Sequence, residues 1–469
     1  MATPDSPSST TQEETALPDL IRLRAITILG LFDLFDHHLT FDERNRILII
    51  YGPNGIGKTT ILRMVVNLFE SNFSYFRKVD FKSLMIELSD ESTLEISKNM
   101  PGSLEESDED DGLHEPASDL TLTLRVPGQE SLELPAPQFQ ADRRPNFPLS
   151  ELERFLPVRR VAARSWRDLR TSEVLSLAEL VERYGDEFPP LRGSVQKPPE
   201  LGSFLNKLPV HLIETQRLLS LPVRSSRTQA MGADEHTSTV IRFSQDLSAR
   251  IQLELARSAQ LSQRLDRSFP IRLLDQELPS SVTEEQIRHK YSVQGDYRGR
   301  LMEAGLLDSA DEVALPEREL GDIERRVLWA YLNDVDQKLG VFSPLLAKIE
   351  LLRDIINSRF HFKLLFTDKI AGFRIETRQG SQISPDSLSS GEQHELVLAY
   401  QLLFIVQPGS LVLIDEPEIS LHVSWQQKFL QDLERIAQTA DLDFLIATHS
   451  PQIIHDRWEL TESLTSENS

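Results

Sequence analysis

The stretch Arg46-Ile47-Leu48-Ile49-Ile50-Tyr51-Gly52-Pro53-Asn54-Gly55-Ile56-Gly57-Lys58-Thr59-Thr60 decides the fold. Its first six residues form an apolar, β-branched run, which is typical of a buried strand. A glycine-rich segment follows directly, and the residues after it have helical character. Glycines let backbone N–H groups turn toward phosphate oxygens, and a helix that begins there adds the positive end of its dipole. This order of strand, loop and helix predicts a phosphate-binding loop in an α/β fold.

Two side chains of this loop carry specific expectations. Lys58 would neutralise phosphate charge, and the hydroxyl of Thr59 would ligate Mg²⁺. The remaining contacts to the phosphates would come from the loop as a whole, namely Gly52, Pro53, Asn54, Gly55, Ile56, Gly57, Lys58, Thr59 and Thr60. ATP and Mg²⁺ are therefore the expected ligands.

A second apolar strand, 411–414, ends in the adjacent carboxylates Asp415 and Glu416. A helical segment from Glu392 to Val406 precedes it and is stopped by Gln407-Pro408-Gly409, so the spacing fits another helix-then-strand unit. Asp415 suits the metal shell, whereas Glu416 suits polarising the attacking water. We expect both residues to be catalytic.

The segment Leu388-Ser389-Ser390-Gly391-Glu392 resembles the signature of ABC-type ATPases. Its Ser-Gly-Glu-Gln form is similar to that of the RecF, SMC and OLD branch. Taken alone, it is also an ordinary helix cap. The resemblance implies a head-to-tail dimer in which Ser389, Ser390, Gly391 and Glu392 meet the nucleotide held by the opposite subunit.

A third apolar strand, 443–448, leads into His449, which matches the switch histidine of this family. The segment Glu418-Ile419-Ser420-Leu421-His422 occupies the position of its D-loop, which lines the subunit interface. Gln216 follows another strand-like segment where a Q-loop metal contact would fall. A lone glutamine carries little information, so this assignment is weaker than the others.

The amino-acid composition excludes several kinds of site and targeting segment. The 469 residues include no cysteine, which excludes disulfides, thiolate metal sites and cysteine nucleophiles and suits the cytoplasm. Residues 1–19 lack the apolar core of a signal peptide and are expected to form a disordered tail. No apolar run approaches the ~20 residues that span a bilayer, so a membrane association is not expected.

The formal net charge of −23 repels nucleic acid, so DNA contact would require a local basic patch. The densest candidate by sequence runs from Arg159 to Arg170. It could meet DNA or an acidic protein. The alternative is a solvated helix whose arginines pair with the nearby glutamates 173, 179 and 182.

The pattern along the chain divides it into five parts. After the tail, residues 20–235 hold the phosphate loop, alternating strands such as 81–88 and 120–126, and the Q-loop. Apolar residues recur every three to four positions from 237 to 360, which predicts an α-helical insertion over 236–360. Residues 361–455 hold the signature, the carboxylates and His449, and residues 456–469 form a second tail. The predicted fold is a mixed sheet with flanking helices and an antiparallel β-subdomain.

Longer motif stretches resemble stand-alone anti-phage defence ATPases, those of the Septu (PtuA) and PARIS (AriA) systems. OLD-type nucleases continue into a Toprim domain, and the twenty residues after His449 are too few for one. The resemblance implies an ATP-hydrolysing sensor or scaffold with a separate effector, expected to be a Toprim-like nuclease, and a phage-encoded trigger. The alternative is a RecF- or SMC-like ATPase that acts on DNA directly in repair or chromosome maintenance.

Overall fold

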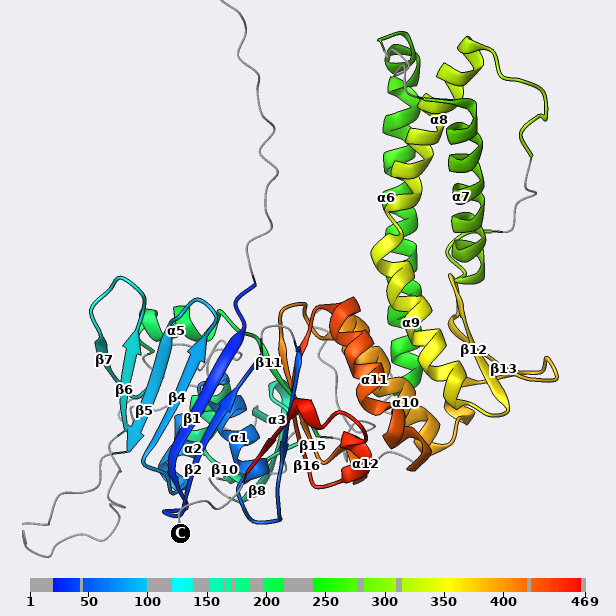
Figure 1. Ribbon diagram of the computed structural model, residues 1–469. Helices are drawn as coiled ribbons and strands as arrows, with labels where there is room; N and C mark the ends of the chain where they lie inside the picture. Colours follow the sequence, from blue (N-terminus) through cyan, green and yellow to red (C-terminus); the bar gives the residue numbers. More distant parts are fainter. Residues whose placement is uncertain are drawn as a thin grey trace, which may run out of the picture.

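The computed structural model describes residues 20–42, 45–98, 120–137, 152–162, 165–169, 174–184, 197–214, 239–275, 282–308, 314–419 and 423–464. Figure 1 shows two neighbouring β-sheets on one side and a group of long helices that stands away from them on the other.

A five-stranded parallel sheet forms the centre of the fold. Its order is β11-β15-β16-β3-β17, and every pair is parallel. The strands are β3 (Ile47–Tyr51), β11 (Val210–Glu214), β15 (Leu411–Asp415), β16 (Asp443–Thr448) and β17 (Thr461–Ser463). The predicted α/β fold is thus confirmed, although this sheet is parallel in its described pairs and not mixed. Continuous apolar strands such as Ile47–Ile50 suit it, because both faces of a parallel sheet are covered.

An antiparallel sheet of order β2-β1-β4-β5-β6-β7 lies beside it. Its strands are β1 (Leu23–Leu31), β2 (Phe35–Thr40), β4 (Ser83–Leu88), β5 (Thr93–Lys98), β6 (Leu120–Arg125) and β7 (Leu132–Pro135). Buried and half-buried residues alternate along β4, as expected for one covered face. Helix α1 (Lys58–Phe69) fills the space between the sheets, and Leu48 and Ile50 of β3 share its apolar core. The opposite face of β3, with Ile47 and Ile49, joins a second core under the helices.

Short elements surround α1. They are α2 (Phe73–Lys78), α3 (Leu152–Phe155), α4 (Leu177–Tyr184) and α5 (Pro199–Leu205) with the three-stranded sheet β10-β9-β8. In this small sheet β8 (Val158–Ala162), β9 (Ser165–Asp168) and β10 (Val174–Ser176) are antiparallel. The arginine-rich run is therefore an antiparallel β-sheet region and not the solvated helix considered above. The buried Trp166 anchors it, and the alternation of Trp166 with exposed Arg167 has the period of a strand.

Four helices build what we call the arm: α6 (Thr239–Asp275), α7 (Glu284–Glu303), α8 (Asp322–Gly340) and α9 (Ser343–Arg359). The 37 residues of α6 correspond to a length of about 55 Å. A three-stranded sheet follows, with β12 (Lys363–Asp368), β13 (Gly372–Thr377) and β14 (Gln382–Ile383). The backbone of Gly372 packs directly against α6 at Ser244. Its φ is 75°, and a Cβ added there would overlap the carbonyl oxygen of Ser244.

The remaining elements connect the arm to the parallel sheet. They are η4 (Pro385–Ser387), α10 (Ser390–Tyr400), the π-helical turn η5 (Gln401–Ile405), η6 (Pro417–Ile419), α11 (Val423–Ala440), α12 (Pro451–Ile454) and η7 (Trp458–Leu460). Tyr400 marks the junction of α10 with α6. Its ring stacks on Phe243 with centroids 4.7 Å apart, and its hydroxyl donates to Asp246 Oδ2 over 2.7 Å.

Candidate nucleotide-binding site

The phosphate loop lies between β3 and α1, as predicted from the order of its residues. Helix α1 begins at Lys58, after Gly57 at φ 103°. The Lys58 ammonium donates to the carbonyl oxygens of Gly52 (2.7 Å) and Pro53 (2.9 Å). Burial lowers the pKa of Lys58, and the charges of Glu416, Asp415 and Glu418 act against that shift. A cation held against carbonyl dipoles at a helix N-terminus favours an anionic ligand.

At Gly52 and Gly57 the surrounding atoms leave no room for a side chain. A side chain at Gly57 would meet Leu31 Cδ2 at 2.5 Å, in addition to the left-handed backbone. A side chain at Gly52 would meet the carbonyl oxygen of Leu464 at 2.8 Å. Behind the loop, the ring of His37 is 3.2 Å from the carbonyl oxygen of buried Ile56. Neighbouring residues thus pack closely against one side of the loop.

The other side of the loop is open. Pro53, Asn54 and Gly55 are exposed, and Thr59 and Thr60 are half-buried in the first turn of α1. A side chain added at Gly55 would meet no atom within 4 Å. The exposed surface is therefore the one from which phosphate oxygens could reach the backbone N–H groups.

Asp415 ends β15 next to the loop. The Thr59 hydroxyl donates to Asp415 Oδ1 over 3.1 Å, which joins two oxygen ligands that sequence reasoning assigned to one metal. Hydroxyl and carboxylate oxygens suit Mg²⁺, which keeps waters and substrate phosphates as its other ligands. Among the described residues no cluster of three or more His, Asp or Glu side chains could hold a metal. Thr59 and Asp415 thus offer two oxygen atoms of the kind that Mg²⁺ prefers.

Glu416 has an unusual backbone conformation. Its φ is 45°, in the left-handed region that non-glycine residues rarely occupy. The Glu416 N–H donates to the carbonyl oxygen of Ala447 (2.9 Å), so the neighbouring strand β16 helps to hold this conformation. Strain of this kind persists where the surrounding structure fixes it, and it is common at functional sites.

Glu418 is the site residue whose role the sequence did not reveal. It accepts hydrogen bonds at Oε1 from the Thr448 hydroxyl (2.8 Å) and the His449 N–H (3.1 Å). The same oxygen lies 3.1 Å from His449 Nδ1, whereas Glu416 Oε1 is 3.8 Å from that nitrogen. Glu418 thus holds His449 beside Glu416. The sequence placed Glu418 at the start of the D-loop segment, two residues after Glu416, but gave no sign of its contact with His449.

The signature residues form a separate group. Ser389 caps α10, and its N–H and hydroxyl donate to Glu392 Oε2 over 2.8 and 2.9 Å. Lys363 of β12 donates to the same oxygen over 2.7 Å. Ser389 and Ser390 are exposed. A side chain at Gly391 would make only ordinary contacts with Trp425, at 3.8 Å or more. Within this chain, packing gives no reason for a glycine at position 391.

Two predicted elements fall on residues that the structure does not describe. Gln216 lies outside the described residues, and so do residues 420–422 of the D-loop segment 418–422. The strand before Gln216, β11, pairs with β15 so that Glu214 is opposite Asp415. The role of Gln216 stays a prediction.

Sequence comparisons match part of the chain to known proteins. Residues 222–455 match the family described as "AAA domain, putative AbiEii toxin, Type IV TA system". The chain is 34% identical over 92 residues, 17% of each chain, to the "Retron Ec83 probable ATPase" of Escherichia coli. It is 34% identical over 88 residues to the "Retron Vc95 probable ATPase" of Vibrio cholerae serotype O1 biovar El Tor, or 16% of this chain. The chain thus spans 17% of the length of either curated relative.

Solved structures show a remote likeness. A Pyrococcus furiosus Smc head domain with an extended coiled coil, bound to the C-terminal domain of ScpA, covers 92% of this chain at 11% identity and a TM-score of 0.33; 91% of that chain is covered. The SMC head domain of Thermotoga maritima covers 95% of this chain and is itself 95% covered, at 9% identity and a TM-score of 0.32.

The segment that matches the family contains the signature, Asp415, Glu416 and His449. Residues 222–455 thus match an AAA-type ATPase domain, and the chain has distant sequence similarity to the retron probable ATPases. In the part of the chain that the structure describes, no helix is both long and apolar enough to cross a membrane.

Proposed function

We propose that the chain hydrolyses ATP with Mg²⁺ and uses the ATP cycle to control a separate effector in a prokaryotic anti-phage defence system. The hydrogen bond between Thr59 and Asp415 carries the enzymatic part. It joins the phosphate loop to the strand-end carboxylates, although 356 positions separate the two residues in sequence.

The chemistry would be divided among five side chains, with Glu418 in a supporting position. Lys58 would balance phosphate charge, while Thr59 and Asp415 would hold Mg²⁺, which supplies further charge compensation when bound. Glu416 would orient and polarise the attacking water. His449, held by Glu418, would lie beside that water and the γ-phosphate.

The complete site would require two subunits. Ser389 donates to Glu392, which also accepts from Lys363, and the Ser389 hydroxyl lies on an exposed helix N-terminus. A helix N-terminus of this kind favours an anion. A head-to-tail dimer would place it against the nucleotide of the other subunit. Gly391 supports this arrangement, because no contact with a described residue demands a glycine there.

The defence role rests on the comparisons. The two curated relatives are named as ATPases of retrons, and the matching family is named for a toxin of a toxin–antitoxin system. The proposed effector is a nuclease on another polypeptide, and the proposed trigger is a phage protein. Co-purification with the products of neighbouring genes, followed by nuclease assays of each protein alone and together, tests this part. Robust metal-dependent cleavage by this chain alone would contradict it.

Hydrolysis is tested with two variants and a matched control. Lys58→Ala should weaken nucleotide binding, because the phosphate charge loses its partner. Glu416→Gln should retain ATP and lower kcat by on the order of 10²- to 10⁴-fold. Glu130→Gln, which makes the same change at an exposed turn, should hydrolyse ATP like the wild type. Wild-type turnover in Glu416→Gln would reject the role of this carboxylate.

The composite site is tested by complementation. Ser389→Arg should leave nucleotide binding intact but abolish hydrolysis and ATP-dependent dimerisation, whereas Ser381→Arg, at another exposed serine, should not. A heterodimer of Ser389→Arg with Lys58→Ala should recover about one working site. If heterodimers form and remain inactive, the site does not combine residues of two subunits.

A further inference from the structure

One face of α6 concentrates positive charge within an acidic protein. Residues 257–271 line a groove of about 780 Å³. Its lining contains three arginines, two glutamines and one serine together with two apolar side chains, namely Arg257, Gln260, Leu261, Gln263, Arg264, Arg267, Ser268 and Ile271. None of the eight is acidic, although the chain as a whole has a net charge of −23. We call this groove the arginine face.

Two of these arginines are available to a ligand. Arg264 and Arg267 are exposed, and within the described ranges neither guanidinium has a hydrogen-bond or ion-pair partner. Arg257 is also largely exposed and contacts Glu254 at 2.6 Å. Elsewhere on α6 the arginines are neutralised more fully: Arg250 pairs with Asp246 and Arg272 with Asp334. The arginine face thus differs from the rest of the helix.

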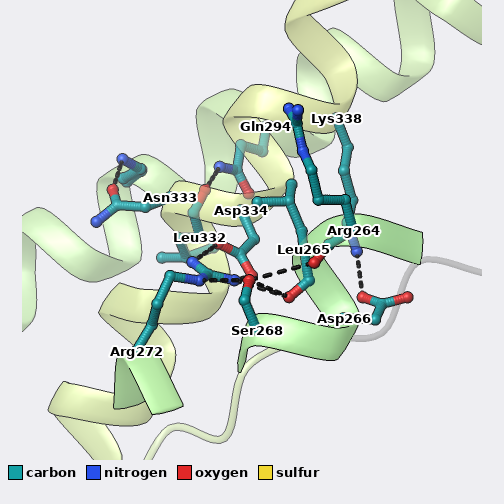
Figure 2. A network of polar contacts seen from close by, with 11 residues as sticks. Arg264, Leu265, Asp266, Ser268, Arg272, Gln294, Leu332, Asn333, Asp334 and Lys338 are labelled. Atoms are coloured by element: carbon teal, nitrogen blue, oxygen red, sulfur yellow. Dashed lines mark hydrogen bonds and ion pairs between the residues drawn. The ribbon is translucent and has the colours of Figure 1, made fainter. Parts of the chain in front are cut away.

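A polar network holds the end of this face in place (Figure 2). Pro270 interrupts the helical hydrogen-bond ladder, since proline has no N–H to donate. The Ser268 hydroxyl and Arg272 Nη2 both donate to the Leu265 carbonyl, over 3.1 and 2.9 Å. Arg272 Nη2 also reaches Asp334 Oδ2 on α8 over 2.7 Å. In Figure 2 the Arg264 guanidinium points away from this network. The helix is therefore fixed while its arginine remains free to bind.

We propose that the arginine face binds the phosphate backbone of a nucleic acid. Arg257 and Arg264 are about 10 Å apart along the helix axis and Arg267 follows after about 4.5 Å, at 1.5 Å per residue. A nucleic acid strand offers a phosphate about every 3.4 Å of its axis, so three guanidiniums can each meet one. Glutamine side chains add neutral donors to phosphate oxygens. Protein interfaces use buried aromatic anchors, and none lines this groove.

This proposal goes beyond the ATPase function and does not depend on it. By sequence, the densest basic run is Arg159–Arg170. In the described part of that run the arginines lie on the β8–β9 hairpin, and the Arg160 guanidinium lies 5.9 Å from the ring centroid of Trp166. On α6 the arginines follow one face of a helix that stands away from the acidic bulk of the chain. Charges more than about 10 Å from the arginines are largely screened at physiological salt.

The test is a salt titration of binding to a fluorescent 40-base-pair duplex, a 40-nucleotide single strand and an RNA hairpin, measured by anisotropy with the full-length chain. The triple variant Arg257→Gln, Arg264→Gln, Arg267→Gln keeps helix propensity. Its control, Arg125→Gln, Arg326→Gln, Arg378→Gln, removes the same charge from other exposed positions. Circular dichroism and ATP hydrolysis establish that both variants are folded.

We expect the triple variant to bind at least one of the three nucleic acids on the order of tenfold or more weakly at low salt. Its slope of log K against log salt should fall by about 2 to 3, or 0.7 to 0.9 for each lost phosphate contact. The control should behave like the wild type. Equal losses in both triples, or no binding by the wild type, would overturn the proposal. So would preferential binding of polyglutamate, which would identify an acidic protein as the partner. Because hydrolysis is measured separately, loss of ATPase activity alone would concern only the proposed function.

Discussion

Charged side chains at the edge of the parallel sheet and in the arm differ in how completely they are paired. At the sheet edge, Lys58 is buried against carbonyl oxygens, Glu416 has a strained backbone, and Glu418 Oε2 has no hydrogen-bond partner among the described residues. In the arm, several charged side chains pair with partners on neighbouring helices, such as Arg300 with Glu350 on α9. A buried charge without its counterpart destabilises the protein until a ligand supplies one. The difference separates a sheet edge with strained and incompletely partnered groups from an arm whose helices are joined by ion pairs.

The boundary between the two regions combines both features. Arg359, at the end of α9, pairs with Glu395 of α10 and Asp432 of α11, and all three side chains are largely buried. The cluster carries one positive and two negative charges. The cluster joins the arm to α10, the helix that begins with the signature. Substitutions in it therefore test how much stability the paired charges contribute where the two regions meet.

The largest effect on stability is expected from Arg359→Met. It leaves buried Glu395 without a cation and Asp432 with only the more distant Arg435, which costs on the order of 3–5 kcal/mol of unfolding free energy. Urea unfolding monitored by circular dichroism measures this loss. Arg435→Met, at a more exposed arginine that also contacts Asp432, is the control and should cost less than about 1 kcal/mol. Equal losses would show that the triad is not the stabilising feature of the boundary.

The same cluster predicts a pH dependence. Burial raises the pKa of Glu395 to about 7, against the opposing charge of Arg359. Because the folded protein then binds more protons than the unfolded chain, this contribution to stability is full below about pH 4.5 and declines as the pH rises toward 7. Glu395→Gln should remove a decline of on the order of 3 kcal/mol. Parallel stability curves for both proteins between pH 5 and 8 would show that Glu395 does not titrate there.

The contact between α6 and β13 is expected to tolerate no side chain. Gly372→Ala combines a φ of 75° with overlap on the Ser244 carbonyl, so it should cost about 2–3 kcal/mol. Gly380→Ala is matched to it, because Gly380 has a φ of 84° and open space around it. Its cost should be limited to about 1 kcal/mol of backbone strain. Thermal unfolding of the two variants distinguishes a close contact from a simple requirement for left-handed backbone.

At the sheet edge, Glu418→Gln should act on the rate and hardly on nucleotide binding. The change weakens the acceptor that holds His449 and Thr448. We expect kcat to fall roughly 10- to 30-fold, or about 1.4–2 kcal/mol of activation free energy, with an unchanged Kd for ATP. Glu434→Gln, which alters an ion pair with Arg457 elsewhere, is the control. A loss of ATP binding instead would assign Glu418 to the phosphate loop.

The smallest effect is expected in the arm. Thr283 caps α7 in a reciprocal arrangement with Gln286, and Thr283→Ala should cost about 1 kcal/mol of helix stability. Hydrogen exchange of α7 amides measures the local loss. ATP hydrolysis should not change, because the cap is remote from the sheet edge. A change in turnover would show that the arm is coupled to the site more tightly than its separate packing suggests.

The sequence allowed most of the sheet edge to be predicted, since each motif directly follows an apolar strand. The roles of Lys58, Asp415 and Glu416 were predicted from motifs that follow apolar strands. In the structure Lys58 begins α1 after β3, and Asp415 ends β15. Glu418 was missed because its role depends on Thr448 and His449, which are 30 and 31 positions away. The arginine-rich run was misread, since charge counts do not reveal a strand period.

The boundary could not be predicted for the same physical reason. Apolar periodicity indicated helices between residues 237 and 360, but it contains no information on which helix faces meet. Gly372 looks like any turn glycine until Ser244, 128 positions earlier, is placed against it. The arginine face was hidden as well, because Arg257, Arg264 and Arg267 are adjacent only on a helix surface.

The position of β3 in the parallel sheet has a consequence for synthesis of the protein. This early strand lies between β16 and β17, which are the last strands of the sheet to be made. Between Tyr51 and Asp443 a ribosome adds roughly 390 residues, which takes about 20–80 s at 5–20 residues per second. During that interval β3 has neither neighbour, and the phosphate loop lacks Asp415 for most of it. A newly made chain must therefore keep an apolar, unpaired strand from aggregating before it can recognise its nucleotide.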